Sequence, residues 1–173
     1  MRKETIMKNL FEKSGRPRVA LVSTPWPLFN RPSIQLAGLK AYAIRELPHL
    51  HVDCLHLYLS VAETLGYELY REISQGTWLA ECCYAALLYP ERSASAHRLW
   101  KNRIRRSSLS GKRDFQGICK TLKTASDRII RGIDWGTYGL AGFSICFGQL
   151  LSTLYFKPVS GFVGQDAWLA KYL

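Results

Sequence analysis

Acidic residues are scarce in this sequence: 13 Asp and Glu stand against 24 Lys and Arg, which gives a formal net charge of +11. The excess is concentrated in one segment, because no acid follows Glu91 until Asp114. The basic residues of this segment are Arg92, Arg98, Lys101, Arg103, Arg105, Arg106, Lys112 and Arg113. A block of this kind attracts nucleic acid, acidic peptide or phosphate, and the alternative is a solvated helix and loop.

Long apolar runs are also missing. The longest two, Trp78–Tyr89 and Leu140–Phe147, are well short of the ~20 residues that span a membrane. The chain does not open with a cationic segment, an apolar core and a small-residue cleavage site, so export is not expected. The five cysteines form no regular framework, which is typical of reduced thiols. We expect a cytoplasmic protein without a membrane partner.

Motifs that would indicate catalysis or metal binding are absent. The sequence has no nucleophile elbow, no Walker loop, no G-x-G-x-x-G and no C-x-x-C, and its histidines lack a second ligand at metal spacing. His51 and Asp53 alternate along one predicted strand, where they form either a hydrogen-bonded rim or a catalytic pair. We therefore expect no catalytic and no metal-ligating residues, and look instead for a binding site.

The stretch Arg16–Leu47 combines a short apolar run, a proline-bounded loop and an amphipathic segment. The run Val19–Val22 is β-branched at both ends, which predicts a buried strand. Ser33 or Asn30 can cap the helix that follows the loop. One predicted helix face carries apolar residues at Ile34, Ala37, Ala41 and Ile44. Strand, loop and helix open a βαβ unit, in which ligands bind at the loop after the strand, here Thr24–Pro32.

Two further strands are predicted at His51–Leu59 and Tyr138–Cys146, and parallel pairing is the default for such units. Between them lies a long helical stretch that begins at the S-x-x-E capping box of Ser60 and contains a long helix capped by Asp114. The fold class predicted is α/β: a Rossmann-like partial parallel sheet of about three strands, with a large helical insertion between strands 2 and 3. The first and third strands are expected to be parallel neighbours.

The chain of 173 residues is long enough for one domain. We expect an N-terminal tail at residues 1–15, a Rossmann-like domain at 16–156 with its helical insertion at about 60–133, and an atypical C-terminal tail at 157–173, where the pattern becomes turn-rich.

The candidate binding residues lie in the loops that follow the first and third strands. They are Thr24, Pro25, Trp26, Phe29, Ser144, Phe147, Gly148 and Gln149. Aromatic rings, a hydroxyl, a close-approach glycine and an amide suit a large flat ligand with apolar faces and amide edges. The alternative is that Trp26 and Phe29 simply cap the core.

The sequence resembles the cobalamin (B12)-binding domain of radical-SAM C-methyltransferases that mature ribosomally synthesised peptides (RiPPs). The resemblance lies in VALVSTPWPLFNRPSIQLAGLKAYA (19–43), VDCLHL (52–57), ETLGYELY (63–70), GTWLAE (76–81) and YGLAGFSICFGQLLSTL (138–154). It covers most of residues 17–156, although none of these segments is a catalytic signature. It implies a cobalamin cofactor, with residues 24–29 beside the corrin ring and 144–149 beside the nucleotide tail. Since there is no D-x-H-x-x-G motif, no histidine of the chain should coordinate cobalt from below.

The sequence also departs from that family. The two further βα units, the Gly-Gly loop and the C-x-x-x-C-x-x-C motif of an iron–sulfur cluster do not occur in it. The resemblance therefore implies a truncated domain with an incomplete pocket, not catalytic alone, whose partner is a precursor peptide or a separate radical-SAM chain. Two alternatives stay open. The chain is a basic interaction module that binds precursor peptide or, less favoured, nucleic acid through Arg92–Arg113, or it is the product of a non-functional gene.

Overall fold

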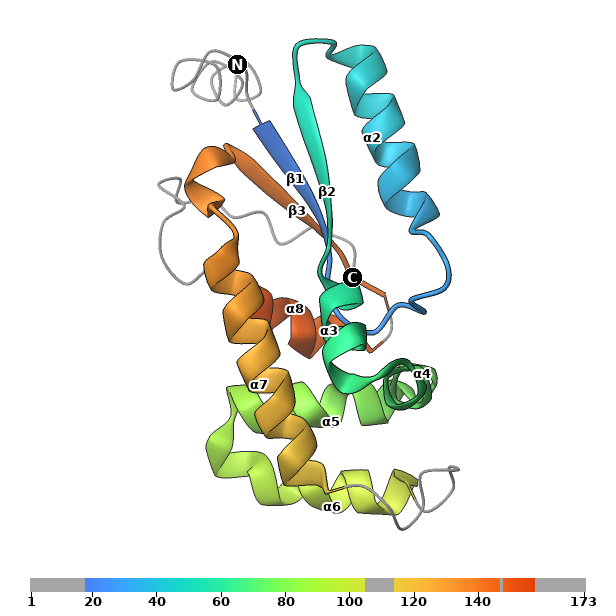
Figure 1. The fold of residues 1–173 in the computed structure, drawn as a ribbon, viewed down its shortest axis with the longest axis vertical. Helices are drawn as coiled ribbons and strands as arrows, with labels where there is room; N and C mark the ends of the chain where they lie inside the picture. The colour runs from blue at the N-terminus through green and yellow to red at the C-terminus, as the bar shows by residue number, and fades with distance from the viewer. Residues whose placement is uncertain (1–17, 105–113, 147, 158–173) are drawn as a thin grey trace, which may run out of the picture.

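The computed structural model describes residues 18–104, 114–146 and 148–157. The sheet within these residues has three parallel strands, β1 (Arg18–Ser23), β2 (His51–His56) and β3 (Leu140–Ser144), in the order β2-β1-β3 (Figure 1). Val22 of β1 pairs in parallel with Phe143 of β3. The predicted α/β class, the three-stranded parallel sheet and the adjacency of its first and third strands are therefore confirmed.

Helices fill the connections between the strands. Helix α2 (Ile34–Glu46) joins β1 to β2, and α8 (Leu150–Phe156) follows β3. The insertion between β2 and β3 consists of α3 (Leu57–Leu65), α4 (Tyr67–Gln75), α5 (Thr77–Leu88), α6 (Ser93–Ile104) and α7 (Phe115–Gly132). Single turns of 3-10 helix, η1 (Pro90–Arg92) and η2 (Trp135–Thr137), precede α6 and β3. The predicted helical insertion is confirmed.

The boundary between β2 and α3 differs from the prediction. The strand ends at His56 rather than at Leu59, and α3 begins at Leu57, so Ser60 lies inside the helix and is not its cap. Within α3 the buried residues follow helical spacing, namely Leu57, Tyr58, Val61 and Ala62. Leu59 is 43% exposed. Alternating apolar residues at the end of β2 fit both a strand and this helix, and burial of Tyr58 selects the helix.

The face of α2 that packs against the sheet is not the predicted one. Ser33, one of the two predicted caps, accepts a hydrogen bond from the Leu36 backbone N–H at 3.3 Å. Leu36 packs against Leu21 and Val52 of the sheet. The residues predicted to face the sheet are instead exposed: Ile34, Ala37, Ala41 and Ile44. The prediction of this face was wrong because α2 carries apolar residues on more than one side, so their spacing does not select one.

Helix α7 follows the prediction closely. The Asp114 carboxylate accepts hydrogen bonds from the backbone N–H groups of Gln116 and Gly117, at 3.0 and 2.9 Å. The buried stripe of the helix comprises Phe115, Ile118, Cys119, Leu122, Ala125 and Ser126. It packs against α3 and α5, so α7 holds helices of the insertion together.

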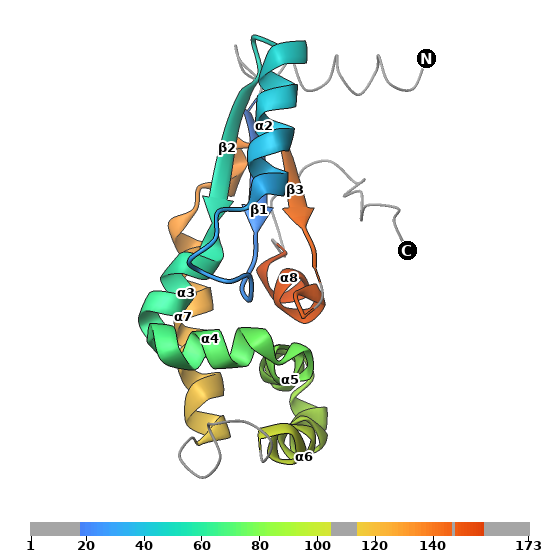
Figure 2. The same cartoon turned by 90° about the vertical axis from the view of Figure 1, so that its right-hand side faces the viewer.

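The two sides of the sheet have unequal cores. The larger core includes Ala20 and Val22 of β1 and extends through α3, α4, α5, α6, α7 and α8. The smaller one holds only Leu21, Leu36 and Val52 as buried residues, under α2. Figure 2 shows α4, α5 and α8 beyond the carboxyl ends of the strands, so the insertion lies where an open α/β sheet usually binds its ligand.

No helix of the described residues is long and apolar enough to cross a membrane. The predicted tails, 1–15 and 157–173, fall outside the described residues, except for Lys157.

Candidate functional site

The loop after β1 is buried at its start. Thr24 has no exposed surface, the Pro25 side chain is less than 2% exposed, and Trp26 is 4% exposed. The Trp26 ring lies between Tyr70 of α4 and Tyr84 of α5, with ring centroids 5.2 and 6.0 Å away. These contacts favour the alternative in which Trp26 caps the core, because its ring offers little surface to a ligand.

A single hydroxyl holds the unusual backbone of this loop. Trp26 has φ +100°, a conformation that costs a residue with a side chain about 1–3 kcal/mol. The Tyr70 hydroxyl accepts a hydrogen bond from the Trp26 N–H at 2.8 Å and donates one to the Pro27 carbonyl at 2.9 Å. Burial raises the pKa of Tyr70, so the hydroxyl stays protonated and keeps both hydrogen bonds. Tyr70 therefore fixes the loop from 44 residues away in the chain.

The loops after β1 and β3 are joined by Gln149. Its side-chain amide nitrogen donates to the Thr24 carbonyl at 2.8 Å, and its amide oxygen accepts from the Cys146 N–H at 2.9 Å. Gln149 is only 2% exposed and its bond to the Thr24 carbonyl is buried, whereas its bond from the exposed Cys146 is partly buried. The predicted proximity of the two loops is confirmed, and the amide expected to face a ligand is used between them.

Helix α8 adds further hydroxyls to this contact. The Thr24 and Thr153 hydroxyl oxygens are 2.8 Å apart. Ser152 donates to the Pro25 carbonyl, with 3.1 Å between its hydroxyl oxygen and the acceptor. We call this buried polar cluster the carboxyl-end junction and define it by Thr24, Pro25, Gln149, Ser152 and Thr153.

The remaining candidate residues differ in burial: Gly148 is buried, Phe29 and Ser144 are partly exposed, and Phe147 is outside the described residues. The Phe29 ring is half-buried against Tyr67, with ring centroids 4.8 Å apart. Ser144 is partly exposed at the end of β3. Gly148 has φ +82°, which only glycine adopts without strain, so it forms the turn before Gln149. Phe147 lies outside the described residues.

Two side chains that organise this region, Tyr70 and Glu81, were not predicted as site residues. The two carboxylate oxygens of Glu81, on α5, accept hydrogen bonds from the backbone N–H groups of Leu150 and Leu151, at 3.1 and 3.0 Å. A carboxylate at a helix N-terminus is favourable for charge as well as for hydrogen bonding. Both residues belong to segments that carry the family resemblance, 63–70 and 76–81, which was the available signal.

An exposed surface adjoins the carboxyl-end junction, between the start of α2 and the end of β3. We call it the α2–β3 flank and define it by Ile34, Gln35, Ser144 and Cys146. Ile34 is 83% exposed, and the Gln35 amide nitrogen lies 3.9 Å from the Cys146 sulfur. Within the described ranges no strand pairs with the outer side of β3. This flank and the adjoining strand edge are accessible to a large ligand or a partner chain.

The amino end of the sheet carries the charged groups instead. The Asp53 carboxylate accepts hydrogen bonds from the Arg18 guanidinium at 2.7 Å and contacts His51 Nε2 at 3.1 Å. Partial burial would raise the pKa of Asp53, but the hydrogen bonds from Arg18 and Tyr138 and the nearby His51 lower it below its usual value. Asp53 is therefore an ionised acceptor in a hydrogen-bonded rim, which favours the rim over the catalytic pair.

The described cysteines offer little reactivity in the core. Burial raises the pKa of Cys82 to about 11, so its thiol stays protonated. Across the part of the chain that the structure describes, no group of three or more His, Cys, Asp or Glu side chains could hold a metal ion.

The basic segment is only partly described. Arg92, Arg98, Lys101 and Arg103 are exposed on η1 and α6, while Ala96, Trp100 and Ile104 bury the opposite side of α6. The other four basic residues of the segment, Arg105, Arg106, Lys112 and Arg113, lie outside the described residues.

Comparisons of the chain with protein-family models, with curated proteins and with solved structures found no match.

Proposed function

We propose that this chain is a cobalamin-binding-type domain of the radical-SAM peptide methyltransferase kind, which binds the cofactor without catalysing methyl transfer alone. The observation that carries the proposal is the Gln149–Thr24 hydrogen bond, which joins the loops at the carboxyl ends of two adjacent parallel strands. Ligands of open α/β sheets bind at this end, beside such loops. Separate segments of the resemblance also converge here, through Tyr70 and Glu81.

Burial separates the residues that shape the loops from those that contact the cofactor. Thr24, Trp26 and Gln149 are buried, so they set the shape of the loops rather than contacting the cofactor. The α2–β3 flank supplies the contact surface: Ile34 offers an apolar side chain, and Gln35 and Ser144 offer polar groups for the amides of the macrocycle edge. A flat ligand with apolar faces and amide edges fits this composition.

The flank alone provides one side of a pocket. The outer edge of β3 is unpaired within the described residues, and Leu140 and Ile145 beside it are 45% and 43% exposed. An unprotected edge of this kind is a template for another strand. We propose that a polypeptide segment of a radical-SAM partner completes the pocket there. The bound cobalamin supplies the methyl-carrying chemistry, and the role of this chain is to bind and orient the cofactor.

The proposal is tested by titrating the purified chain with hydroxocobalamin, following its visible absorption and its co-elution in gel filtration. We expect saturable binding that Ile34→Glu weakens about tenfold, since a charge would be buried against an apolar face. Leu59→Glu is the matched control, because Leu59 is also an exposed aliphatic residue but lies on α3, away from the flank. The Leu59→Glu variant should bind cobalamin like the wild type. A titration without saturation rejects the proposal, as does equal weakening in both variants.

A second candidate function is a basic module that binds an acidic precursor peptide or, less favoured, nucleic acid. What supports it is the exposed cationic side of α6, with Arg98, Lys101 and Arg103 opposite the buried Trp100. Binding of this kind weakens steeply with salt, because each neutralised phosphate or carboxylate releases counterions. Replacing these three residues by Gln should abolish salt-dependent binding of a labelled acidic peptide. Binding that is insensitive to salt, or unchanged in the triple variant, rules this function out.

A further inference from the structure

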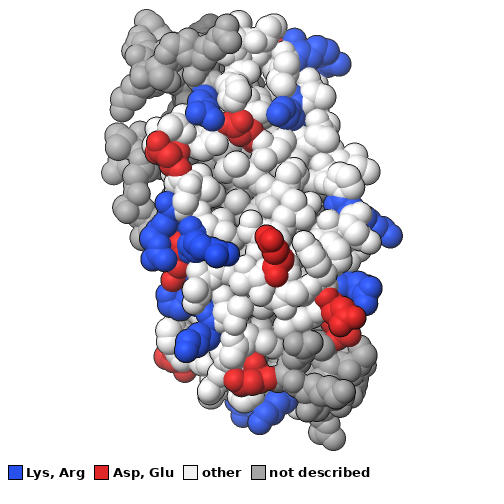
Figure 3. Space-filling view, viewed as in Figure 1, with Lys and Arg blue, Asp and Glu red and all other residues white. Residues whose placement is uncertain are grey.

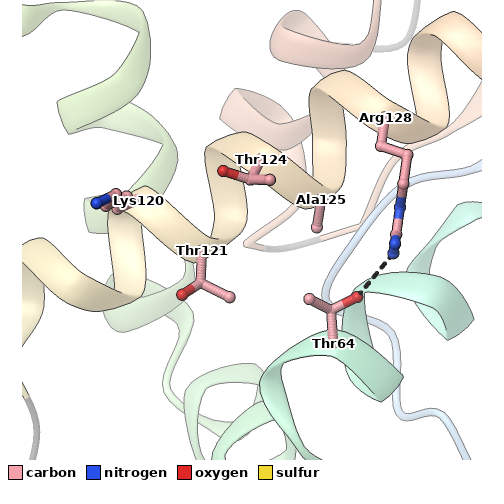
Figure 4. Close-up of a pocket in the computed structure, with 6 residues that line it drawn as sticks. All are labelled: Thr64, Lys120, Thr121, Thr124, Ala125 and Arg128. Carbon is pink, nitrogen blue, oxygen red and sulfur yellow. Dashed lines mark hydrogen bonds between the residues drawn. The ribbon is translucent and has the colours of Figure 1, made fainter.

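A concave surface lies away from the sheet, between α3 and α7. This groove has a volume of about 250 Å³ and is lined by Thr64, Lys120, Thr121, Thr124, Ala125 and Arg128 (Figure 4). Five of its six lining residues therefore carry a hydrogen-bond donor, and two of these donors are cations. None of the residues belongs to the carboxyl-end junction or to the α2–β3 flank.

The register of α7 creates the groove. Thr121, Thr124 and Arg128 are three and four residues apart, so they follow one another along the same side of the helix. Ala125 is 1% exposed and small, which leaves space beside α3 where a larger side chain would fill it. The three-and-four spacing of the polar residues runs beside the buried stripe that attaches α7 to α3.

Thr64 holds Arg128 across the groove. The Thr64 hydroxyl donates its hydrogen to the Ser60 carbonyl at 2.8 Å, so its oxygen is left as an acceptor for Arg128 Nη2 at 3.3 Å. Figure 4 shows the guanidinium reaching from α7 toward α3, with Lys120 at the opposite end of the groove. One guanidinium N–H is used by Thr64, and the other donors of this group remain for a ligand.

The groove has a net positive charge that no acid of its own lining offsets. The nearest acid along α7, Asp127, is engaged elsewhere, because its carboxylate accepts hydrogen bonds from Lys123 at 2.6 Å and from Tyr155 at 2.7 Å. Among the described residues, the hydroxyls of Thr121 and Thr124 and the Lys120 ammonium form no hydrogen bond or ion pair. Basic side chains gather along the side of the molecule that α7 occupies (Figure 3).

We propose that this groove binds the phosphate group of a small soluble phosphate monoester. A dianion with several acceptor oxygens matches the remaining donors of Arg128 and the hydroxyls of Thr121 and Thr124 better than a carboxylate does, because charge-assisted bonds to Arg satisfy phosphate from more than one direction. Lys120, at the other end of the groove, adds positive charge rather than a direct contact. No aromatic side chain lines the groove, so a stacked nucleobase has no partner there. The volume is also below the roughly 300–1,000 Å³ of pockets for larger ligands.

The test is a titration of the full chain with glycerol 3-phosphate at constant ionic strength, followed by calorimetry and by shifts of the amide NMR signals of residues 64, 121 and 124. We expect saturable binding with a Kd of about 1 mM or tighter. Glycerol without phosphate should not bind. Arg128→Gln should weaken binding about tenfold, through the loss of its charge-assisted bonds.

The matched control is Arg131→Gln, which removes the same charge from the same helix at an exposed residue outside the groove and should change the affinity less than about twofold. Because Arg128 also links α7 to α3, Thr124→Val provides a second variant that removes one exposed hydroxyl without that link, and it should weaken binding about threefold. Equal losses in Arg128→Gln and Arg131→Gln would show only general charge attraction and overturn the proposal. Absence of saturation, or wild-type affinity in both Arg128→Gln and Thr124→Val, would overturn it as well.

Discussion

The two ends of the same three strands are built in opposite ways. In the carboxyl-end junction the polar side chains are neutral, buried and hydrogen-bonded to one another, as with Thr24 and Gln149. At the amino end they are charged and partly exposed: the side chains of Arg18 and Asp53 are 41% and 26% exposed. These side chains have hydrogen-bond partners at both ends, although Trp26 Nε1 at the carboxyl end and Arg18 Nε at the amino end are buried without one among the described residues. The two ends differ in how much water surrounds their polar groups.

This difference determines what a broken contact costs. A buried donor or acceptor that loses its partner cannot turn to water, so the protein bears the full desolvation penalty. An exposed ion pair exchanges its partner for water and salt, and its loss has a small effect. We therefore expect the carboxyl end to control the stability of the domain, and the amino end to tolerate substitution.

The largest effect is expected for Trp26→Ala at the carboxyl end. The ring packs between Tyr70 and Tyr84 and is 4% exposed, so its removal should lower the free energy of unfolding by about 3–5 kcal/mol. Urea denaturation followed by circular dichroism measures this change. The comparison uses Tyr138→Ala at the amino end, where a partly exposed ring lies over the Arg18 guanidinium at 5.1 Å, with an expected loss of about 1 kcal/mol.

A further variant separates the ring from the strained backbone of the loop. Trp26→Gly removes the same ring but permits φ +100° without a penalty. We expect it to be at least as stable as Trp26→Ala, although glycine normally destabilises a folded chain relative to alanine. If Tyr138→Ala is as harmful as Trp26→Ala, the proposed difference between the two ends is wrong.

A smaller loss is expected for Tyr70→Phe, which deletes one oxygen atom and keeps the ring. The Trp26 N–H and the Pro27 carbonyl then lose their shared partner inside the protein, at a cost of about 1–3 kcal/mol. Hydrogen exchange at the Trp26 amide should accelerate in parallel. Tyr67→Phe is the control, because Tyr67 is 52% exposed. Equal stability of the two variants would mean that Tyr70 does not hold the loop.

Local sequence signals predicted the elements that depend on neighbouring residues. The β-branched run ending at Val22 and the segment around Phe143 were correctly predicted as strands. A short apolar run between turn residues is compatible with few structures other than a buried strand. Asp114 predicted the start of α7. A carboxylate at this position accepts hydrogen bonds from the backbone N–H groups of the next two or three residues, whatever the rest of the fold is.

Contacts between residues far apart in the sequence could not be predicted in the same way. Spacing along α2 suits several faces, and only the position of Leu21 and Val52 selects the one that contains Leu36. The pairing of Tyr70 with the backbone of Trp26 joins residues that no short pattern connects. The residues predicted for the site lie after β1 and β3, and how deeply they are buried depends on the insertion that packs over them.

The N-terminus of α8 connects the insertion to the carboxyl end, and Glu81→Gln tests its contribution. The substitution keeps one acceptor oxygen but removes the negative charge that faces the Leu150 and Leu151 N–H groups. We expect a loss of about 0.5–1 kcal/mol at low ionic strength, reduced by added salt. Glu91→Gln, an exposed glutamate in η1, should leave the free energy of unfolding unchanged. If both variants behave alike, Glu81 does not stabilise the helix through its charge.

The smallest effect is expected at the amino end, for Asp53→Asn. The pKa of Asp53 is lower in the folded chain than the value of about 3.9 in an unfolded one. A group with a lowered folded pKa stabilises the protein above its unfolded pKa, and this contribution is lost as pH falls through the folded pKa. The stability of Asp53→Asn should therefore lie less than about 1 kcal/mol below that of the wild type at pH 7, and the difference should shrink as the pH falls below about 3.9. A large difference at pH 7 that persists in acid would show that Asp53 stabilises the sheet through packing rather than charge, and the two ends would then be alike.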